Sequence, residues 1–171
     1  MDIEGFNNRM VYLGGPIDLV GFDEAGDWRQ GAAEILARRA YATFDPFAAF
    51  SNVARDLHGH QVMAINRTAI QVCGMFFARF ESESIGTSRE LEICRQFGKP
   101  VFLWCRQQKE YARLEKAIST SDCMLILEPY LGDALRVAVN HMEAHARKAE
   151  EELGQLMFEI NEPQSEEDDP A

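Results

Sequence analysis

The sequence predicts an α/β protein in which a parallel β-sheet is covered by helices on both faces. Short runs rich in apolar, β-branched and aromatic residues alternate along the chain with longer stretches of helical spacing. Glycine and proline stand at the ends of several of these stretches, where they favour turns. With 171 residues, 46% of them hydrophobic and 26% charged, the composition is that of one ordinary globular domain. Such an alternation is typical of βαβ units.

The first half of the chain predicts two strand–helix pairs, at residues 9–13, 24–39, 41–44 and 55–72. The first strand stops at Gly14, Gly15 and Pro16, which suit a tight turn and cannot continue a ladder. The first helix has apolar residues at helical spacing, among them Trp28 and Leu36. The second helix has a similar apolar stripe.

The second half predicts three further pairs, with strands at 73–80, 101–105 and 123–127 and helices at 86–97, 111–118 and 131–153. Gly98 and Pro100 end the middle helix in the expected way. The five strands therefore predict a doubly wound, flavodoxin-like (Rossmann-like) parallel sheet. In such folds ligands bind at the carboxyl ends of the strands.

Charge is distributed unevenly along the chain. The net charge is -11, from 28 acidic and 17 basic residues, and nine of the acids lie in the last 22 residues, which contain no lysine or arginine. We interpret residues 1–153 as a single domain and residues 154–171 as an acidic, disordered tail. The nearly neutral body excludes a groove for a nucleic acid polymer but leaves room for a mononucleotide.

No signal peptide or membrane-spanning run is visible, so we expect a cytoplasmic protein without membrane partners. Four scattered cysteines, Cys73, Cys94, Cys105 and Cys123, form no CxxC pair. They predict reduced thiols rather than a disulfide or zinc framework.

The segment from Ser84 to Glu92 is the most informative for function. It follows an apolar strand and opens a helix, so its backbone N–H groups and hydroxyls would face a ligand at the strand ends. Glu90 lies about one turn into that helix. Its carboxylate can complement the helix dipole, or it can act chemically.

Three segments resemble the nucleoside 2-deoxyribosyltransferase superfamily, which includes deoxynucleoside 5′-monophosphate N-glycosidases. They are VYLGGPI (residues 11–17), SIGTSRELE (84–92) and GKPVFL (98–103). The resemblance implies that Glu90 is a nucleophile that expels the base from a 2′-deoxynucleoside or its 5′-monophosphate and holds the sugar as a covalent glycosyl-enzyme. It implies that Tyr12 orients Glu90, although Tyr12 can also be a core aromatic. A second nucleobase or water would release the sugar.

The resemblance further implies a substrate site without metal or organic cofactor, in a homo-oligomer that takes a small nucleoside or nucleotide. The expected substrate-binding residues are Gly14, Gly15, Pro16, Ile17, Asp45, Ser84, Gly86 and Ser88. Ser84 favours a 5′-monophosphate, because a hydroxyl at a helix N-terminus can receive a phosphate that a carboxylate would repel. Ser84 can also be a helix cap.

Several residues have simpler interpretations. Asp45 before Pro46 favours a turn over a substrate contact, and Trp28 favours the core over stacking on a base. His58 with His60, and His141 with His145, lack a third ligand and favour solvated positions over a metal site.

Many superfamily members have an aspartate at the start of the third strand, where this chain has Gly74. This difference motivates a second hypothesis, a catalytically silent nucleotide-binding module of the same fold. A phosphoribohydrolase of the lysine-decarboxylase-like type is a third, disfavoured by the absence of a PGGxGT-type loop.

Overall fold

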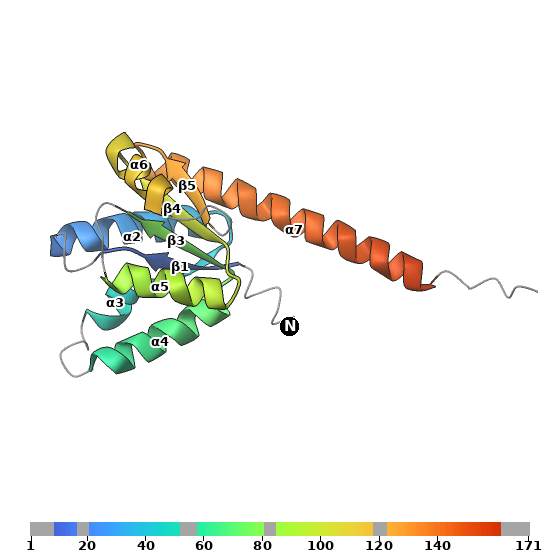
Figure 1. The fold of residues 1–171 in the computed structure, drawn as a ribbon, viewed down its shortest axis with the longest axis horizontal. Helices are drawn as coiled ribbons and strands as arrows, with labels where there is room; N and C mark the ends of the chain where they lie inside the picture. The colour runs from blue at the N-terminus through green and yellow to red at the C-terminus, as the bar shows by residue number, and fades with distance from the viewer. Residues whose placement is uncertain (1–8, 17–20, 52–57, 81–84, 118–122, 162–171) are drawn as a thin grey trace, which may run out of the picture. The chain divides into compact units, whose positions relative to one another are not determined.

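The protein forms a five-stranded, all-parallel sheet with strand order β2-β1-β3-β4-β5, as Figure 1 shows. The computed structural model describes residues 9–16, 21–51, 58–80, 85–117 and 123–161. The strands are β1 (Met10–Gly14), β2 (Ala42–Phe44), β3 (Met75–Arg79), β4 (Val101–Cys105) and β5 (Cys123–Leu127). The predicted doubly wound α/β fold is therefore confirmed.

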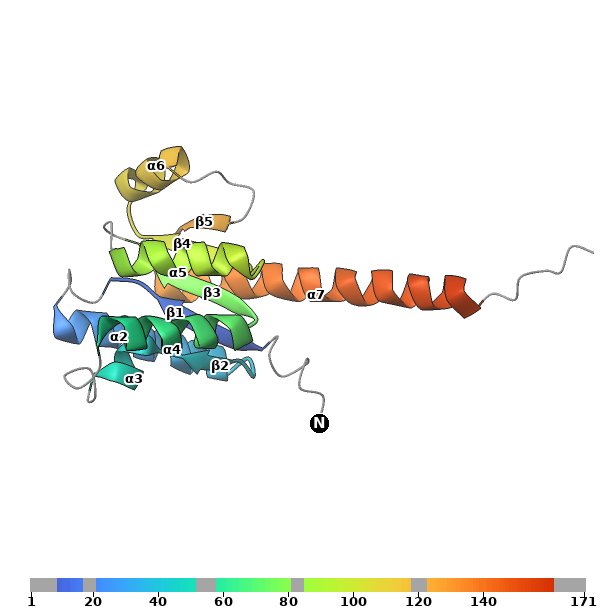
Figure 2. The ribbon, with the colours of Figure 1, turned by 60° about the horizontal axis from the view of Figure 1, so that its bottom comes forward.

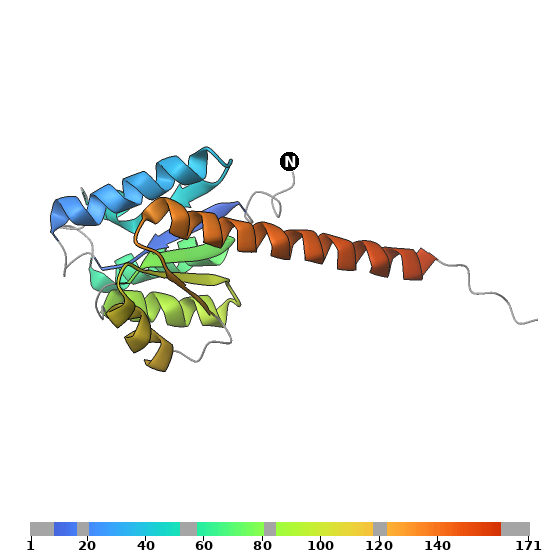
Figure 3. The same ribbon diagram turned by 90° about the horizontal axis from the view of Figure 1, so that it is seen from above.

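Helices cover both faces of the sheet. They are α2 (Phe22–Ala37), α3 (Pro46–Phe50), α4 (Gly59–Val72), α5 (Ile85–Gln96), α6 (Gln108–Ala117) and α7 (Leu131–Asn161). Figure 2 shows α4 and α5 side by side on one face, and Figure 3 shows α2 and the first turns of α7 over the other. A Cβ on Gly31 of α2 would lie 3.4 Å from the Leu131 side chain of α7, so these two helices touch.

Two elements differ from the sequence prediction. Helix α3 was not expected; it forms because the Asp45 carboxylate accepts a hydrogen bond from the Phe47 backbone N–H at 2.8 Å and Pro46 occupies the first helical position. Helix α7 continues to Asn161, beyond residue 153, because residues 154–161 contain good helix formers and the next proline is Pro163.

The chain divides into two compact units, residues 1–138 and residues 139–171. The first unit contains the whole sheet. The second contains the remainder of α7.

Side chains on β1 alternate between the two faces of the sheet, as strand geometry requires. Tyr12 is fully buried in the cluster beneath α4, α5 and α6, together with Phe76 and Leu103. Its ring stacks between Phe44 (5.5 Å between centroids) and Phe76 (5.4 Å). Because Tyr12 pairs in register with Phe44 on one neighbouring strand and Phe76 on the other, the three rings form a row across the sheet.

All four cysteines are free thiols, and Cys73, Cys94 and Cys105 are buried. Burial raises the pKa of each of these three thiols to about 12, so they remain protonated and pack as small hydrophobic groups. No helix in the described part of the chain is long and apolar enough to span a bilayer.

Candidate active site

Glu90 lies on α5 with its carboxylate turned towards the sheet. The residue is 6% exposed, and the Tyr12 hydroxyl donates a 2.7 Å hydrogen bond to its Oε1. Tyr12 reaches it from the middle of β1, 78 residues away in sequence. The two residues predicted to be catalytic are thus in direct contact.

Asn66 of α4 is a third member of this cluster, and the sequence analysis missed it. Asn66 is 5% exposed, and its Nδ2 donates to the same Glu90 Oε1 at 3.3 Å. Glu90 Oε2 makes no hydrogen bond within the described part of the chain. One oxygen of the carboxylate is therefore held by two donors, and the other remains available for chemistry.

Tyr12 combines its two predicted roles. Its ring is a core aromatic with 0% exposure, while its hydroxyl is the donor to Glu90. Burial, and then the adjacent Glu90 charge, raise the pKa of Tyr12 far above its ordinary value. The phenol therefore stays protonated and acts only as a hydrogen-bond donor.

Burial raises the pKa of Glu90 from its ordinary 4.5 to about 7. The Tyr12 hydrogen bond and the positive charge of Arg29 act in the opposite direction, but desolvation is the largest effect. A carboxylate that titrates near neutral pH inside a fold is typical of a catalytic group.

Arg29 of α2 is the source of that positive charge, and the residue is fully buried. Its guanidinium donates to three backbone carbonyls: from Nη1 to Ala25 at 2.6 Å, from Nη2 to Gly15 at 2.9 Å and from Nε to Leu13 at 3.4 Å. Arg29 therefore ties helix α2 to the end of β1 and to the turn that follows it.

Asp45, predicted as a substrate contact or a turn residue, lies beside this arginine. Its Oδ1 is 3.5 Å from Arg29 Nε and also caps α3. Desolvation raises the pKa of Asp45, and the Arg29 charge opposes that increase. Trp28 is 7% exposed, which confirms the core interpretation, and the Arg29 guanidinium lies 4.7 Å from its ring centroid. Desolvation also lowers the pKa of Arg29.

The predicted loop residues Gly14, Gly15 and Pro16 are all buried. A Cβ on Gly14 would lie 2.2 Å from the Phe76 ring, so the aromatic row excludes any side chain there. Gly15 has φ +140°, and a Cβ there would lie 3.0 Å from the Arg79 carbonyl oxygen. Both positions therefore require glycine for structural reasons, in addition to its predicted role in binding.

The start of α5 presents an exposed edge. Gly86 and Ser88 are exposed, whereas Thr87 between them is 2% exposed and points inward. Ser84 and Ile17, both predicted to bind substrate, lie outside the described residues. Arg79, at the carboxyl end of β3, is 5% exposed and pairs through Nη2 with Glu24 of α2 at 2.5 Å.

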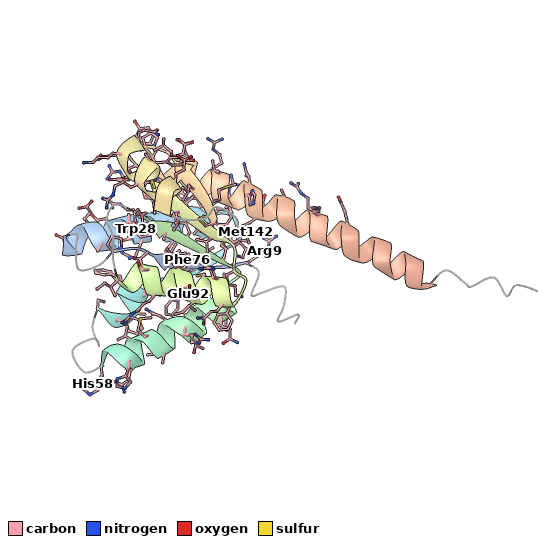
Figure 4. The ribbon with its side chains drawn as sticks, viewed as in Figure 1. Arg9, Trp28, His58, Phe76, Glu92 and Met142 are labelled. Carbon is pink, nitrogen blue, oxygen red and sulfur yellow. The ribbon has the colours of Figure 1, made fainter. Side chains whose placement is uncertain are left out.

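His58 and His60 lie apart from the contact between Tyr12 and Glu90 (Figure 4). His58 and His60 stack on each other at the start of α4 (5.7 Å between centroids), and Figure 4 shows His58 far from Phe76 at the centre of the sheet. The described residues contain no group of three or more His, Cys, Asp or Glu side chains suited to a metal ion. Gly74 precedes β3, where its N–H donates to the Met10 carbonyl at 2.8 Å. Asn66, together with Tyr12, is the polar side chain hydrogen-bonded to Glu90.

The sequence contained a weak signal for Arg29 and Asn66, the two polar residues that its motifs did not identify. Arg29 lies at helical spacing from Ala25 and Ala32, both buried, and Asn66 is adjacent to buried Ala69 and Ile70 on the same helix. A polar or charged residue within a buried helical stripe is uncommon unless it has specific partners. The partners themselves come from distant segments, so spacing alone does not reveal them.

Comparisons with known proteins support the fold. No family model and no curated protein matches this sequence. Among solved structures, BlsM aligns over 92% of this chain and 96% of its own, with a TM-score of 0.59 at 17% identity. A CMP N-glycosidase from Clostridium botulinum, BcmB, aligns over 77% and 98%, with a TM-score of 0.56 at 16% identity.

A 2-deoxyribosyltransferase from Bacillus psychrosaccharolyticus also matches, over 58% of this chain and 74% of its own, with a TM-score of 0.46 at 18% identity. All three belong to the superfamily that the sequence motifs resemble. At these identities BlsM and BcmB show a common fold, and the chain therefore shares the fold of the nucleoside 2-deoxyribosyltransferase superfamily.

Proposed function

We propose that this protein cleaves the N-glycosidic bond of a nucleoside or nucleoside 5′-monophosphate through Glu90, with transfer of the sugar to water or to another nucleobase. The observation that supports this most directly is the asymmetry of the Glu90 carboxylate. Tyr12 and Asn66 both donate to Oε1, whereas Oε2 has no hydrogen bond within the described residues. A carboxylate nucleophile attacks through a single oxygen, and the donors on Oε1 leave Oε2 for that role.

In the first step, Oε2 forms a bond to the anomeric carbon while the bond from that carbon to the base nitrogen breaks. The electron pair of the broken bond goes to the base, which takes a proton from water. In the second step, water or the nitrogen of another base attacks the anomeric carbon and loses a proton. The bond to Oε2 breaks, and its electron pair restores the Glu90 carboxylate.

Tyr12 and Arg29 assist by favouring the ionised form of Glu90. Both lower its pKa against the effect of burial, and the net result is a pKa of about 7. At neutral pH a substantial fraction of the carboxylate is therefore ionised and nucleophilic, while the buried surroundings leave it weakly solvated.

Two arguments support a nucleoside 5′-monophosphate as the substrate. BcmB, which shares the fold, is a CMP N-glycosidase. Arg79, almost fully buried, ends β3 at the carboxyl edge of the sheet and could receive a 5′-phosphate. The predicted binding residues Gly15, Gly86 and Ser88 belong to the same edge. No cofactor is required by this chemistry, and we retain the homo-oligomer as a proposal, to be tested by light scattering.

The test is to incubate the full chain with nucleosides and nucleoside 5′-monophosphates, in ribo and 2′-deoxy forms, with and without an acceptor base, and to quantify free base by chromatography. We expect release from at least one substrate and its loss in Glu90→Gln. Glu92→Gln is the matched control, because Glu92 lies two residues away on the same helix, is 58% exposed and pairs with Arg95. Intact-protein mass spectrometry should detect the glycosyl adduct on the wild type.

Two results would contradict the proposal. Absence of base release from every substrate, combined with nucleotide binding, would favour the catalytically silent binding module. Undiminished release by Glu90→Gln would show that another group performs the chemistry.

A further inference from the structure

Asn66 contains a buried carbonyl oxygen that no described residue satisfies. Its Nδ2 faces Glu90 Oε1, as it must, because a carboxylate only accepts hydrogen bonds. The amide oxygen, Oδ1, therefore points away from that carboxylate. It is shielded from solvent, in a residue that is only 5% exposed, and has no hydrogen-bond partner in the part of the chain that the structure describes.

An orphan acceptor of this kind is uncommon in a folded protein and calls for an explanation. A hydrophobic residue of similar size would fill the same space without the cost of a buried, unpaired carbonyl. Because the orphan oxygen belongs to the residue bonded to Glu90, a donor on the substrate can supply the missing hydrogen bond.

The chemistry at Glu90 limits which donor this is. A sugar attacked by Oε2 must lie with its anomeric carbon against the carboxylate. The hydroxyl on the adjacent carbon, the 2′-hydroxyl of a ribose, is then the sugar hydroxyl nearest the carboxylate, and Asn66 is hydrogen-bonded to that carboxylate. The 3′-hydroxyl is one carbon further from the reacting centre.

We propose that Asn66 Oδ1 accepts a hydrogen bond from the 2′-hydroxyl of the substrate, so that the site selects ribonucleosides or ribonucleotides over their 2′-deoxy forms. The inference rests on the proposed function. It departs from the 2′-deoxy sugar implied by the sequence resemblance. Asn66 then links the sugar and the nucleophile through one amide, and such a bond to the 2-hydroxyl strengthens in an oxocarbenium-like transition state.

The experiment measures kcat/KM for CMP and dCMP, and for the other three ribo and deoxy pairs, with wild type, Asn66→Leu and Asn66→Asp. Asn66→Leu removes both polar atoms at similar volume, whereas Asn66→Asp keeps an acceptor oxygen. We expect the ribo-to-deoxy ratio to fall at least about 10-fold in Asn66→Leu and to be largely retained in Asn66→Asp. A 2′-hydroxyl intrinsically disfavours the oxocarbenium ion, so the change in ratio between variants is decisive. Damage to the fold lowers kcat/KM for both sugars and therefore cancels in this ratio.

A binding measurement keeps the inference testable without turnover. Calorimetry of the wild type should show ribose 5-phosphate binding at least about 10-fold more tightly than 2-deoxyribose 5-phosphate. If no substrate releases base, the proposed function fails while this comparison still tests Asn66. An unchanged ratio in Asn66→Leu would overturn the inference, as would equal affinity for the two sugar phosphates or no binding of either.

Discussion

Two buried charges lie on opposite faces of the sheet, and the protein provides for them very differently. Arg29, beneath α2, is 0% exposed and donates to three backbone carbonyls with a carboxylate at 3.5 Å. Glu90, on α5, is 6% exposed, and both of its hydrogen bonds reach one oxygen. One charge is surrounded by partners, and the other is left half-satisfied.

The difference separates a structural charge from one for which we propose a chemical role. A buried cation with a full set of acceptors fixes the backbone around it, here the end of β1 and Gly15. A buried carboxylate with a free oxygen gains reactivity, at some expense to the stability of the fold. Burial raises the pKa of Glu90 to about 7, which is consistent with the second role.

Removing Arg29 should have the largest effect on stability. Arg29→Met would remove the side-chain hydrogen bonds to the carbonyls of Leu13, Ala25 and Gly15 and leave Asp45 without its counter-charge. We expect a loss of about 3–5 kcal/mol in the free energy of unfolding, measured by denaturant titration.

The matched control is Arg38→Met, at the exposed end of the same helix, with an expected change within about 0.5 kcal/mol. A similarly small change in Arg29→Met would show that Arg29 does not have the structural role described above.

Glu90→Gln should instead stabilise the protein, in a pH-dependent way. The pKa of Glu90 is raised from 4.5 to about 7 by folding, so the folded state binds its proton more tightly than the unfolded state. Wild-type stability therefore falls as the pH rises from about 4.5 to about 7, by up to about 3 kcal/mol. Glutamine keeps the Oε1 acceptor without the charge, so the variant avoids this loss.

Denaturant titrations at pH 4 and pH 8 would measure this effect. The advantage of Glu90→Gln over wild type should be present at pH 8 and nearly absent at or below pH 4.5, whereas Glu92→Gln should match wild type throughout. An advantage of the same size at every pH would mean that Glu90 does not titrate in the range given above.

The sequence predicted the framework of this site but not its full polar environment. Strands β4 and β5 have the predicted bounds, because each is a continuous apolar run between clear turn signals. The pair Tyr12 and Glu90 was predicted from motifs. Asn66 was missed because its role depends on α4 packing beside α5, and Arg29 because its acceptors are backbone carbonyls, which carry no signature in sequence.

Tyr12→Phe tests how far Glu90 depends on one of its two hydrogen-bond donors, with little change in packing. It removes the 2.7 Å hydrogen bond to Oε1 and leaves the aromatic row between Phe44 and Phe76 in place. A hydrogen bond to a charged group contributes about 1.5–3 kcal/mol, so kcat/KM should fall about 10- to 100-fold.

The pH dependence separates this role from a purely structural one. The Tyr12 bond lowers the pKa of Glu90, so its loss should move the acid limb of kcat/KM to higher pH. A lower rate with an unshifted acid limb would mean that Tyr12 supports the fold and not the ionisation of Glu90.

Asp45→Asn should have the smallest effect of these substitutions on stability. It tests how much Arg29 depends on the charge of its carboxylate neighbour. Asparagine keeps the Oδ1 acceptor for the Phe47 N–H and removes only the charge at 3.5 Å from Arg29 Nε. The pKa of Asp45 is raised, so the attraction to Arg29 does not offset desolvation, and ionisation of Asp45 lowers stability as the pH rises through that pKa.

We therefore expect Asp45→Asn to change stability by about 1 kcal/mol or less at pH 7, and Asp45→Ala to lose about 1 kcal/mol more, because it also removes the cap of α3. Denaturant titration of both variants separates cap from charge. A loss of 3 kcal/mol or more in Asp45→Asn would mean that the backbone carbonyls alone do not satisfy Arg29. Arg29 would then, like Glu90, be incompletely satisfied by its hydrogen bonds, and the contrast between the two buried charges would disappear.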